Sequence, residues 1–498
     1  MRNKRLKLLL SLALIMCMML SQALFAAAAP SSSSKTDLDY LRSVMDMIKE
    51  RHKGDVTDQQ LIEGALKGMF GSMDPYTTYF TPDQADSFLS EVNGIYDGIG
   101  ISMGKSNDYI IVVKVFPLSP AEKSGLMPGD RIASLDGKSI IGISLEEASA
   151  LIKGEAGTKV TLGIVRSGTD GILYVPVTRE RIKLNPVTYE IKDGIAYIRL
   201  DTFNTNTAEF MAKALDDADA AGVNKIILDL RNNPGGDVDQ AVSLAQHFVP
   251  EGLVTKLDFQ SEAMADKEYY SKLKNPKYKL AILVNGLSAS ASEIVVGAVQ
   301  DTKAGTIIGT KTFGKAKVQN LVPMLTPEAY AKYEKQLGVK VIDALDLINK
   351  YKVNPRQDEI IGWSKITTGL YYTPKGRMID EQGITPDILV EDPVPVAGVD
   401  ITSIQKLAKA TKPGLNSEST DVYNAEKILK ILGYDVDVPD PILDEKTAAA
   451  ISQFRSDNGL YPGDMLDFTT QDILNSKLES EKLRLDAQYS KAVEVLNK

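Results

Sequence analysis

Few residues of the kinds that usually carry hydrolytic or redox chemistry are present in this chain. Its 498 residues include one cysteine, Cys17, and two histidines, His52 and His247. Cys17 lies in an apolar N-terminal segment, so the chain without that segment can form no internal disulfide and depends on its core. A Ser–His–Asp triad would need one of the histidines, but His52 lies in a polar segment. His247, in "LAQHFVP", is typical of a packed or capping histidine.

Motifs for metal ions and nucleotides are also absent. The chain has no HExxH, no CxxC, no carboxylate-rich loop, no P-loop and no GxGxxG after an apolar run. We therefore predict no metal site and no cofactor. If the chain is a hydrolase with a nucleophile, lysine is the main remaining candidate for its general base.

Residues 1–30 have the features of an export signal. Four basic residues precede an apolar run over 8–20, and the small residues of "SQALFAAAAP" follow it. The run is shorter than the about 20 residues that usually span a membrane. Cleavage after Ala28 is therefore the preferred interpretation, and an uncleaved membrane anchor is the alternative. Both predict export across the cytoplasmic membrane, to a secreted, cell-wall-associated or membrane-anchored location.

Acidic side chains outnumber basic ones in this chain. The whole chain has a net charge of −9. Without the first 28 residues it carries 53 basic and 66 acidic side chains, a net charge of −13. This balance argues against nucleic acid as a partner.

The chain changes character several times along its length. Helical spacing of apolar residues dominates first, a small α+β module with Gly/Pro/Asp turns follows, and then short apolar runs alternate with helical segments. Continuous apolar runs such as "KIILDL" and "LAILV" are typical of strands buried on both faces. The predicted regions are a helical region over 37–94, the α+β module over 95–180, an α/β core over 181–396, a helical domain over 400–478 and a charged tail over 479–498.

One short stretch, "NGLSASASEIVVG", places three serines between a predicted strand and a predicted helix. Ser290 and Glu293 fit a capping box, which explains the stretch without any catalysis. A serine at such a turn is also well placed for nucleophilic attack, because N–H groups at the helix start can stabilise an oxyanion. The stretch alone favours the cap and does not select among Ser288, Ser290 and Ser292.

Two further turns follow predicted strands. "DLRNNPGGD" (229–237) places backbone N–H groups at a strand end, where α/β folds bind ligands. "GTKTFGKAKVQ" (309–319) contains two candidate bases, Lys315 and Lys317, and a third that ranks after them, Lys311. Lysine acts as a base only where burial or a nearby cation lowers its pKa.

Taken together, these stretches resemble the carboxyl-terminal processing proteases, also called tail-specific proteases. The family pattern is matched in order by "MDPYTTYFTPDQADSF", "DLRNNPGG", "VNGLSASASEIVVGAVQD", "GTKTFGKAKVQ" and "GRMIDEQGITPDILVE". The α+β module resembles a PDZ domain through "GIGI" (98–101) and "SPAEKSGLMPGDRIASLDGKSI" (119–140). The resemblance implies an α/β protease core of ClpP/crotonase-like type with an inserted PDZ domain. It also implies an N-terminal helical segment and a C-terminal helical domain similar to peptidoglycan-binding domains.

The resemblance assigns roles to particular residues. Ser290 matches the family nucleophile, Lys315 its general base and Gln319 a glutamine that orients the lysine. The backbone N–H groups of Ala291 and Gly235 match the oxyanion donors. One departure is Ala316, where the family usually has glycine.

The resemblance also implies what the protein binds. Gly98, Ile99, Gly100 and Ile101 match the loop with which a PDZ domain holds a substrate's C-terminal carboxylate. The groove residues are apolar, so we expect protein substrates with apolar C-terminal tails. The resemblance further implies a homodimer, and it leaves open whether the C-terminal domain contacts peptidoglycan or serves the dimer. The expected function is an exported serine endopeptidase with a Ser–Lys dyad. The alternatives are a catalytically inactive PDZ or cell-wall scaffold and a crotonase-type acyl-CoA enzyme.

Overall fold

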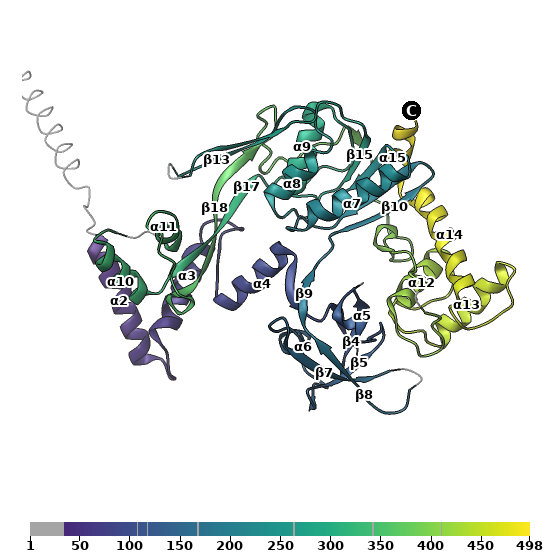
Figure 1. Ribbon diagram of the computed structural model, residues 1–498, viewed down its shortest axis with the longest axis horizontal. Coiled ribbons are helices and arrows are strands. Elements are labelled where there is room, and N and C mark those ends of the chain that lie inside the picture. The colour runs from purple at the N-terminus through teal and green to yellow at the C-terminus, as the bar shows by residue number, and fades with distance from the viewer. Residues whose placement is uncertain are drawn as a thin grey trace, which may run out of the picture. The chain divides into compact units, whose positions relative to one another are not determined.

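The computed structural model describes residues 34–498, except 107, 117, 167–168, 262–263, 341–342 and 410. The predicted export signal or membrane anchor, residues 1–30, lies outside the described residues. Within the described part of the chain, no helix is long and apolar enough to cross a membrane. The chain forms two compact units (Figure 1). The first ends at Thr81 and also contains Pro323–Ser364, and the second contains Pro82–Val322 and Lys365–Lys498.

The first unit is mainly helical. Its elements are α2 (Ser34–Arg51), α3 (Asp58–Gly71), β1 (Thr78–Phe80), α10 (Pro327–Leu337), α11 (Ala344–Asn349) and the 3-10 helix Gln357–Glu359. Ala329, Tyr333 and Leu347 form a small core between α10 and α11. Helix α3 buries none of its side chains. Large apolar side chains on or just after α2 and α3 are exposed: Tyr40, Leu41, Met47, Met69 and Met73.

A six-stranded sheet forms the centre of the second unit. Its order is β10-β11-β12-β15-β16-β19, in which only the β10–β11 pair is antiparallel. The strands are β10 (Val187–Lys192), β11 (Ile195–Leu200), β12 (Lys225–Asp229), β15 (Lys279–Val284), β16 (Thr306–Gly309) and β19 (Ile388–Leu389). The parallel strands are apolar on both faces because helices cover both. This is the α/β core that the sequence predicts.

Alternate side chains of the strands point into two separate cores. Leu228 and Ile282 pack with α7 (Thr207–Ala220), α8 (Val238–Ala245) and α9 (Ala291–Thr302). Ile227 and Leu283 face the opposite side, where α15 (Ala487–Asn497) covers the sheet.

A second sheet contains β13 (Gly252–Phe259), β14 (Lys267–Ser271), β17 (Lys317–Leu325) and β18 (Ile360–Tyr372). Strands β13 and β18 pair antiparallel, with Lys256 opposite Tyr372. The end of β18 thereby brings Tyr371, which is buried, to the central core.

The PDZ-like module is a six-stranded sheet with two short helices, inserted through a two-stranded ribbon. Strands β2 (Ile95–Gly98) and β9 (Glu180–Lys183) pair antiparallel and form the ribbon. Helix α4 (Pro82–Asn93) precedes it. The module's elements are β3 (Ile101–Ser106), β4 (Tyr109–Val115), α5 (Pro120–Lys123), β5 (Arg131–Leu135), β6 (Lys138–Ser139), α6 (Leu145–Ile152), β7 (Lys159–Val165) and β8 (Leu173–Thr178).

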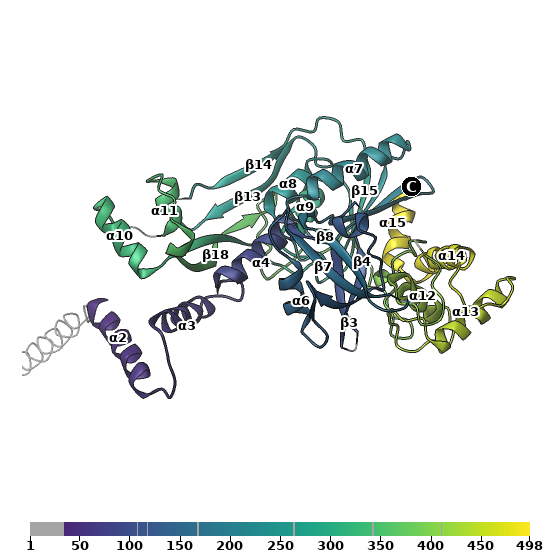
Figure 2. The ribbon, with the colours of Figure 1, turned by 60° about the horizontal axis from the view of Figure 1, so that its bottom comes forward.

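The C-terminal domain is helical, as the sequence predicts (Figure 2). Its helices are α12 (Thr420–Ile431), α13 (Glu445–Asp457) and α14 (Phe468–Leu485), preceded by a 3-10 helix, Ile401–Ser403. The charged tail expected over 479–498 differs from the structure, because these residues complete α14 and form α15. Ala492 and Leu496 of α15 are buried against the central sheet. Lys491, Glu494 and Lys498 lie together on the exposed side of α15, whereas Asp486, which precedes this helix, is buried.

One buried carboxylate of this domain makes its stability depend on pH. Glu426 is 3% exposed and accepts hydrogen bonds from Thr447 Oγ1 and from the Asp440 amide. Burial raises the pKa of Glu426 to about 7. Because this value lies above that of the unfolded chain, the protonated form favours folding. The contribution of Glu426 to the free energy of unfolding is therefore fully present below about pH 4.5 and is lost as the pH rises through about 7.

We expect Glu426→Gln to be more heat-stable than the wild type at pH 8.5, by at least about 2 °C. A glutamine keeps the shape of the protonated acid but cannot ionise, so the gain should shrink as the pH is lowered to 5. Calorimetric melting temperatures across this pH range test it. A gain that does not change with pH would show that ionisation of Glu426 is not the cause.

Candidate active site

Ser290 lies at the turn between β15 and α9 in a strained conformation. Its φ of 56° and ψ of −115° are unusual for a residue with a side chain, and such strain clusters at functional sites. The flanking serines are buried and structural: Ser288 Oγ donates to the Leu230 carbonyl at 2.8 Å and Ser292 Oγ to the Asn233 carbonyl at 3.0 Å. Of the three serines, only Ser290 is partly exposed.

The carboxylate of Glu293 joins the serine turn to the lysine turn. It accepts hydrogen bonds from the Ser290 amide at 2.9 Å and the Lys315 amide at 2.9 Å. It also accepts from the Gly314 amide at 2.7 Å and from Thr312 Oγ1 at 2.6 Å. Glu293 is fully buried, so these four donors satisfy its charge. The residue that the sequence identifies only as a helix cap therefore fixes the relative position of two turns.

Tyr371 is a second link between the two turns. Its hydroxyl lies 2.9 Å from the Ser290 carbonyl oxygen and 2.6 Å from the Lys315 carbonyl oxygen. Burial raises the pKa of Tyr371 well above its ordinary value. The phenol therefore stays protonated and remains a hydrogen-bond donor.

The three candidate lysines have different environments. Lys315 and Lys317 are half-buried and line one cavity with Ser290, whereas Lys311 is exposed. Lys317 Nζ lies 3.6 Å from Asp380 Oδ2, so a carboxylate already engages it. Lys315 belongs to the turn that Glu293 ties to the serine turn, since its amide donates to the same carboxylate oxygen as the Ser290 amide.

Ala316 fits its turn without strain. It is fully buried, and its φ is not positive, whereas that of Gly314 is +89°. The Ala316 amide donates to Asp380 Oδ1 at 3.0 Å, and its carbonyl accepts from the Tyr371 amide at 3.0 Å. The alanine therefore leaves the lysine turn intact.

The "PGG" turn lies directly against the serine turn. A Cβ on Gly235 would lie 2.8 Å from both the Ala291 nitrogen and Ser290 Cβ, so only glycine fits there. Within the described part of the chain, the amides of Ala291 and Gly236 have no hydrogen-bond acceptor. The Gly235 amide, in contrast, donates to Asn233 Oδ1 at 2.9 Å. Gly235 is thus close to the serine as expected, but its N–H is already engaged.

A cavity of about 400 Å³ connects these groups. Gln319 lines it, and its amide nitrogen donates to the Lys317 carbonyl at 3.1 Å and to Thr367 Oγ1 at 3.4 Å. The orienting role of Gln319 toward Lys315 stays a prediction. Among the described residues, no group of three His, Cys, Asp or Glu side chains is placed to hold a metal ion.

The PDZ-like module has its own cavity of about 400 Å³. The expected loop, Gly98–Ile101, lines it together with apolar side chains such as Phe116 and Ile152. The amides of Ile99 and Gly100 have no acceptor among the residues that the structure describes. Helix α4 borders both cavities: Ser87 and Ser90 line the PDZ cavity, and Phe88, Leu89 and Val92 line the one at Ser290.

Comparisons with known proteins assign most of the chain to known families. Four family models match: "Peptidase family S41" over residues 194–390, "PDZ domain" over 87–165, "Activating protease CtpB N-terminal domain" over 17–84 and a peptidoglycan binding domain over 418–474.

Relatives that match most of this chain come from several bacteria. The chain is 30% identical to "Carboxy-terminal processing protease CtpA" of Bacillus subtilis over 94% of this chain and 92% of the relative. It is 37% identical to "Carboxy-terminal-processing protease" of Bartonella bacilliformis over 69% of this chain and 73% of the relative. Among solved structures, it is 25% identical to "Photosystem II D1 C-terminal processing protease", with a TM-score of 0.37, over 70% of this chain and 86% of the other. The chain belongs to the carboxy-terminal processing proteases, serine peptidases of family S41.

Proposed function

We propose that this protease is an exported endopeptidase that cleaves with a Ser290–Lys315 dyad and captures substrate C-terminal tails with its PDZ domain. The observation that carries the proposal is the strained Ser290, held together with Lys315 on two turns around one cavity. The carboxylate of Glu293 ties these turns to each other. The more detailed description of the core as ClpP/crotonase-like stays a prediction.

The proposed reaction needs no histidine. Neutral Lys315 accepts the proton of the Ser290 hydroxyl, and Ser290 Oγ attacks the scissile carbonyl carbon. The Ala291 amide, which is free, donates to the oxyanion, and the adjacent "PGG" turn supplies a second amide. If that amide is Gly235, it must first leave Asn233. Lys315 returns the proton to the leaving nitrogen as the tetrahedral intermediate collapses, so the C–N bond breaks, the amine is released, and an acyl-enzyme is left that water hydrolyses. Gln319 lies in the same cavity and is proposed to orient Lys315.

Tail capture rests on the PDZ cavity. The free amides of Ile99 and Gly100 can donate to a terminal carboxylate, and an extended peptide can add as a strand beside β3. The apolar lining by Ile101, Phe116 and Ile152 favours apolar C-terminal side chains.

We expect an unfolded substrate with an apolar tail to be cleaved at least about tenfold faster as the free acid than as the C-terminal amide, because amidation removes the charge that the loop binds. The measurement is kcat/KM for matched peptides that differ only at the terminus. A tail ending in aspartate serves as the control for side-chain preference. Equal rates for acid and amide would contradict carboxylate capture.

We also propose a homodimer and a contact with peptidoglycan. The exposed apolar side chains of α2 and α3 support a protein–protein contact, and the match of residues 418–474 supports wall binding. Export, with or without a remaining membrane tether, is supported by the N-terminal sequence. Sedimentation of the purified protein and co-sedimentation with cell-wall sacculi examine the two contacts separately.

A further inference from the structure

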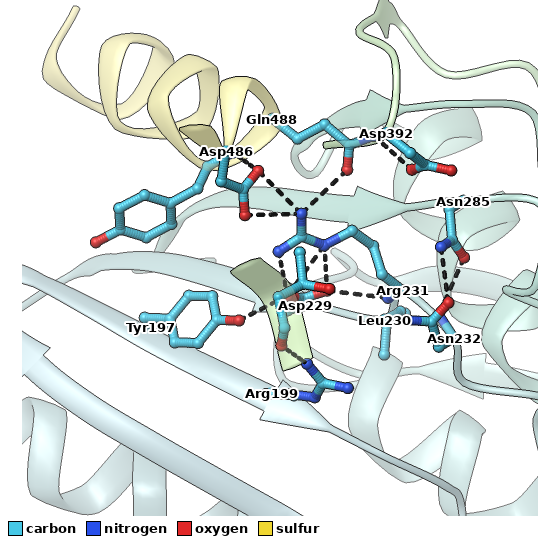
Figure 3. A network of polar contacts seen from close by, with 12 residues as sticks. Tyr197, Arg199, Asp229, Leu230, Arg231, Asn232, Asn285, Asp392, Asp486 and Gln488 are labelled. Carbon is cyan, nitrogen blue, oxygen red and sulfur yellow. Dashed lines mark hydrogen bonds and ion pairs between the residues drawn. The ribbon is translucent and has the colours of Figure 1, made fainter. Parts of the chain in front are cut away.

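A buried arginine links the loop beside Ser290 to the end of the chain. Arg231 follows β12 by two residues and is 3% exposed. One side of its guanidinium binds Asp229, with Nη2 2.6 Å from Oδ2 and Nε 2.9 Å from Oδ1. The other side binds the C-terminal segment, with Nη1 2.8 Å from Asp486 Oδ2 and 3.3 Å from Gln488 Oε1 (Figure 3).

The C-terminal partners are themselves firmly held. Asp486 lies between α14 and α15, is 4% exposed, and caps α15 by accepting from the Tyr489 amide at 3.0 Å. Gln488 is fully buried and donates to the Val390 carbonyl and to Asp392, each at 2.9 Å. Helix α15 then packs on the sheet through Ala492 and Leu496.

On its other side, the loop after Arg231 is bonded to the serine turn. The Leu230 carbonyl accepts from Ser288 Oγ, and the Asn233 carbonyl accepts from the Ala289 amide at 3.0 Å. Asn232 and Asn285 exchange two hydrogen bonds, of 3.0 and 2.9 Å. Hydrogen bonds therefore connect the loop after Arg231 to the residues on both sides of Ser290.

The charge of Arg231 depends on both of its carboxylate partners. Burial lowers the pKa of the guanidinium, but Asp229 and Asp486 more than offset this effect, and the pKa lies well above its ordinary value. Tyr197 donates to Asp229 at 2.6 Å and completes the cluster on the strand side. Without the charge of Asp486, this buried cation would keep only one carboxylate partner, Asp229.

We propose that Asp486 is a positioning residue for peptide hydrolysis: through Arg231 it fixes the loop 230–235, and the last segment of the chain is therefore part of the protease core. This inference rests on the proposed Ser290 chemistry. Residues outside the stretches that resemble the family thus contribute to the rate of the reaction.

Asp486→Asn in the full-length protein tests the inference. Asparagine is as good a helix cap as aspartate, so the substitution removes the charge and keeps the start of α15. We expect kcat to fall about ten- to hundredfold, the effect of a misplaced site, with KM within twofold of the wild type. Inhibition by a peptide aldehyde, which forms a hemiacetal with the serine, should weaken in parallel with kcat. Glu494→Gln, on the exposed side of α15, is the matched control and should keep wild-type values.

Other outcomes separate the inference from the proposed function. If Asp486→Asn does not fold, Gln488→Ala, which leaves the Asp486–Arg231 pair in place, should give a smaller loss of kcat at unchanged KM. Wild-type kcat per folded molecule in whichever variant folds would overturn the positioning role. Hydrolysis by Ser290→Ala at the wild-type rate would instead overturn the proposed chemistry and leave the ion-pair geometry untouched.

Discussion

Ser290→Ala and Lys315→Ala should each reduce cleavage of an unfolded protein by at least about 10³-fold while the fold is retained. Removing the hydroxyl removes the nucleophile. Removing the amine leaves the Ser290 hydroxyl without a base, because neither histidine lines the cavity at Ser290. The measurement is release of peptides from casein, with melting temperatures recorded for each variant.

Lysine variants of the same turn are the controls for this prediction. Lys311 is exposed and does not line the cavity, so Lys311→Ala should keep nearly full activity. Lys317→Ala loses an ion pair with Asp380 and should be affected less than Lys315→Ala. If Lys317→Ala loses as much cleavage activity as Lys315→Ala, the assignment of Lys315 as the base is wrong.

Glu293→Gln should reduce kcat by at least about 10²-fold and also lower the melting temperature. The carboxylate accepts from two donors on each oxygen, and each pair contains at least one backbone N–H. A glutamine must point its NH₂ at one of these pairs, so a buried N–H loses its acceptor, at a cost of about 1–3 kcal/mol. The two turns that carry Ser290 and Lys315 then separate.

A buried carboxylate at the other end of the same helix is the matched control. Asp301 is 8% exposed, forms an ion pair with Arg377 at 2.6 Å, and accepts from the Lys375 amide. Asp301→Asn should lower the melting temperature without a selective loss of kcat. If Glu293→Gln lowers the melting temperature but leaves kcat unchanged, Glu293 is a structural residue only.

The order of the motifs is enough to predict which residues form the candidate site. It does not give the physical reason why these residues are suited to it. Ser290 stands out in the sequence through its resemblance to the family, but the physical reason lies in the fold, where Ser288 and Ser292 bond to the loop after β12. Local spacing identifies the bond from Glu293 to the Ser290 amide. The donors from Thr312 and Lys315 lie 19 and 22 residues further along, and no local pattern predicts them.

The C-terminal segment, residues 479–498, shows a second limit to what the sequence predicts about the fold. Its charge suggests a solvated tail, yet Tyr489, Ala492, Val493 and Leu496 follow the spacing of one helix face. That signal was present in the sequence. The sequence does not show what this face packs against, because the sheet of β12, β15 and β16 is built from residues about 180 or more positions earlier.

The ribbon of β2 and β9 has a consequence for how the enzyme can diversify. The Leu184 amide donates to the Gly94 carbonyl at 2.7 Å, and Ile95 lies opposite Lys183. The inserted PDZ domain thus leaves the protease and returns to it at one point. A different domain whose ends meet in the same way can be grafted there without altering the order of strands in the central sheet. Recombination at this point would change which substrates the enzyme recognises and would leave its catalytic core unchanged.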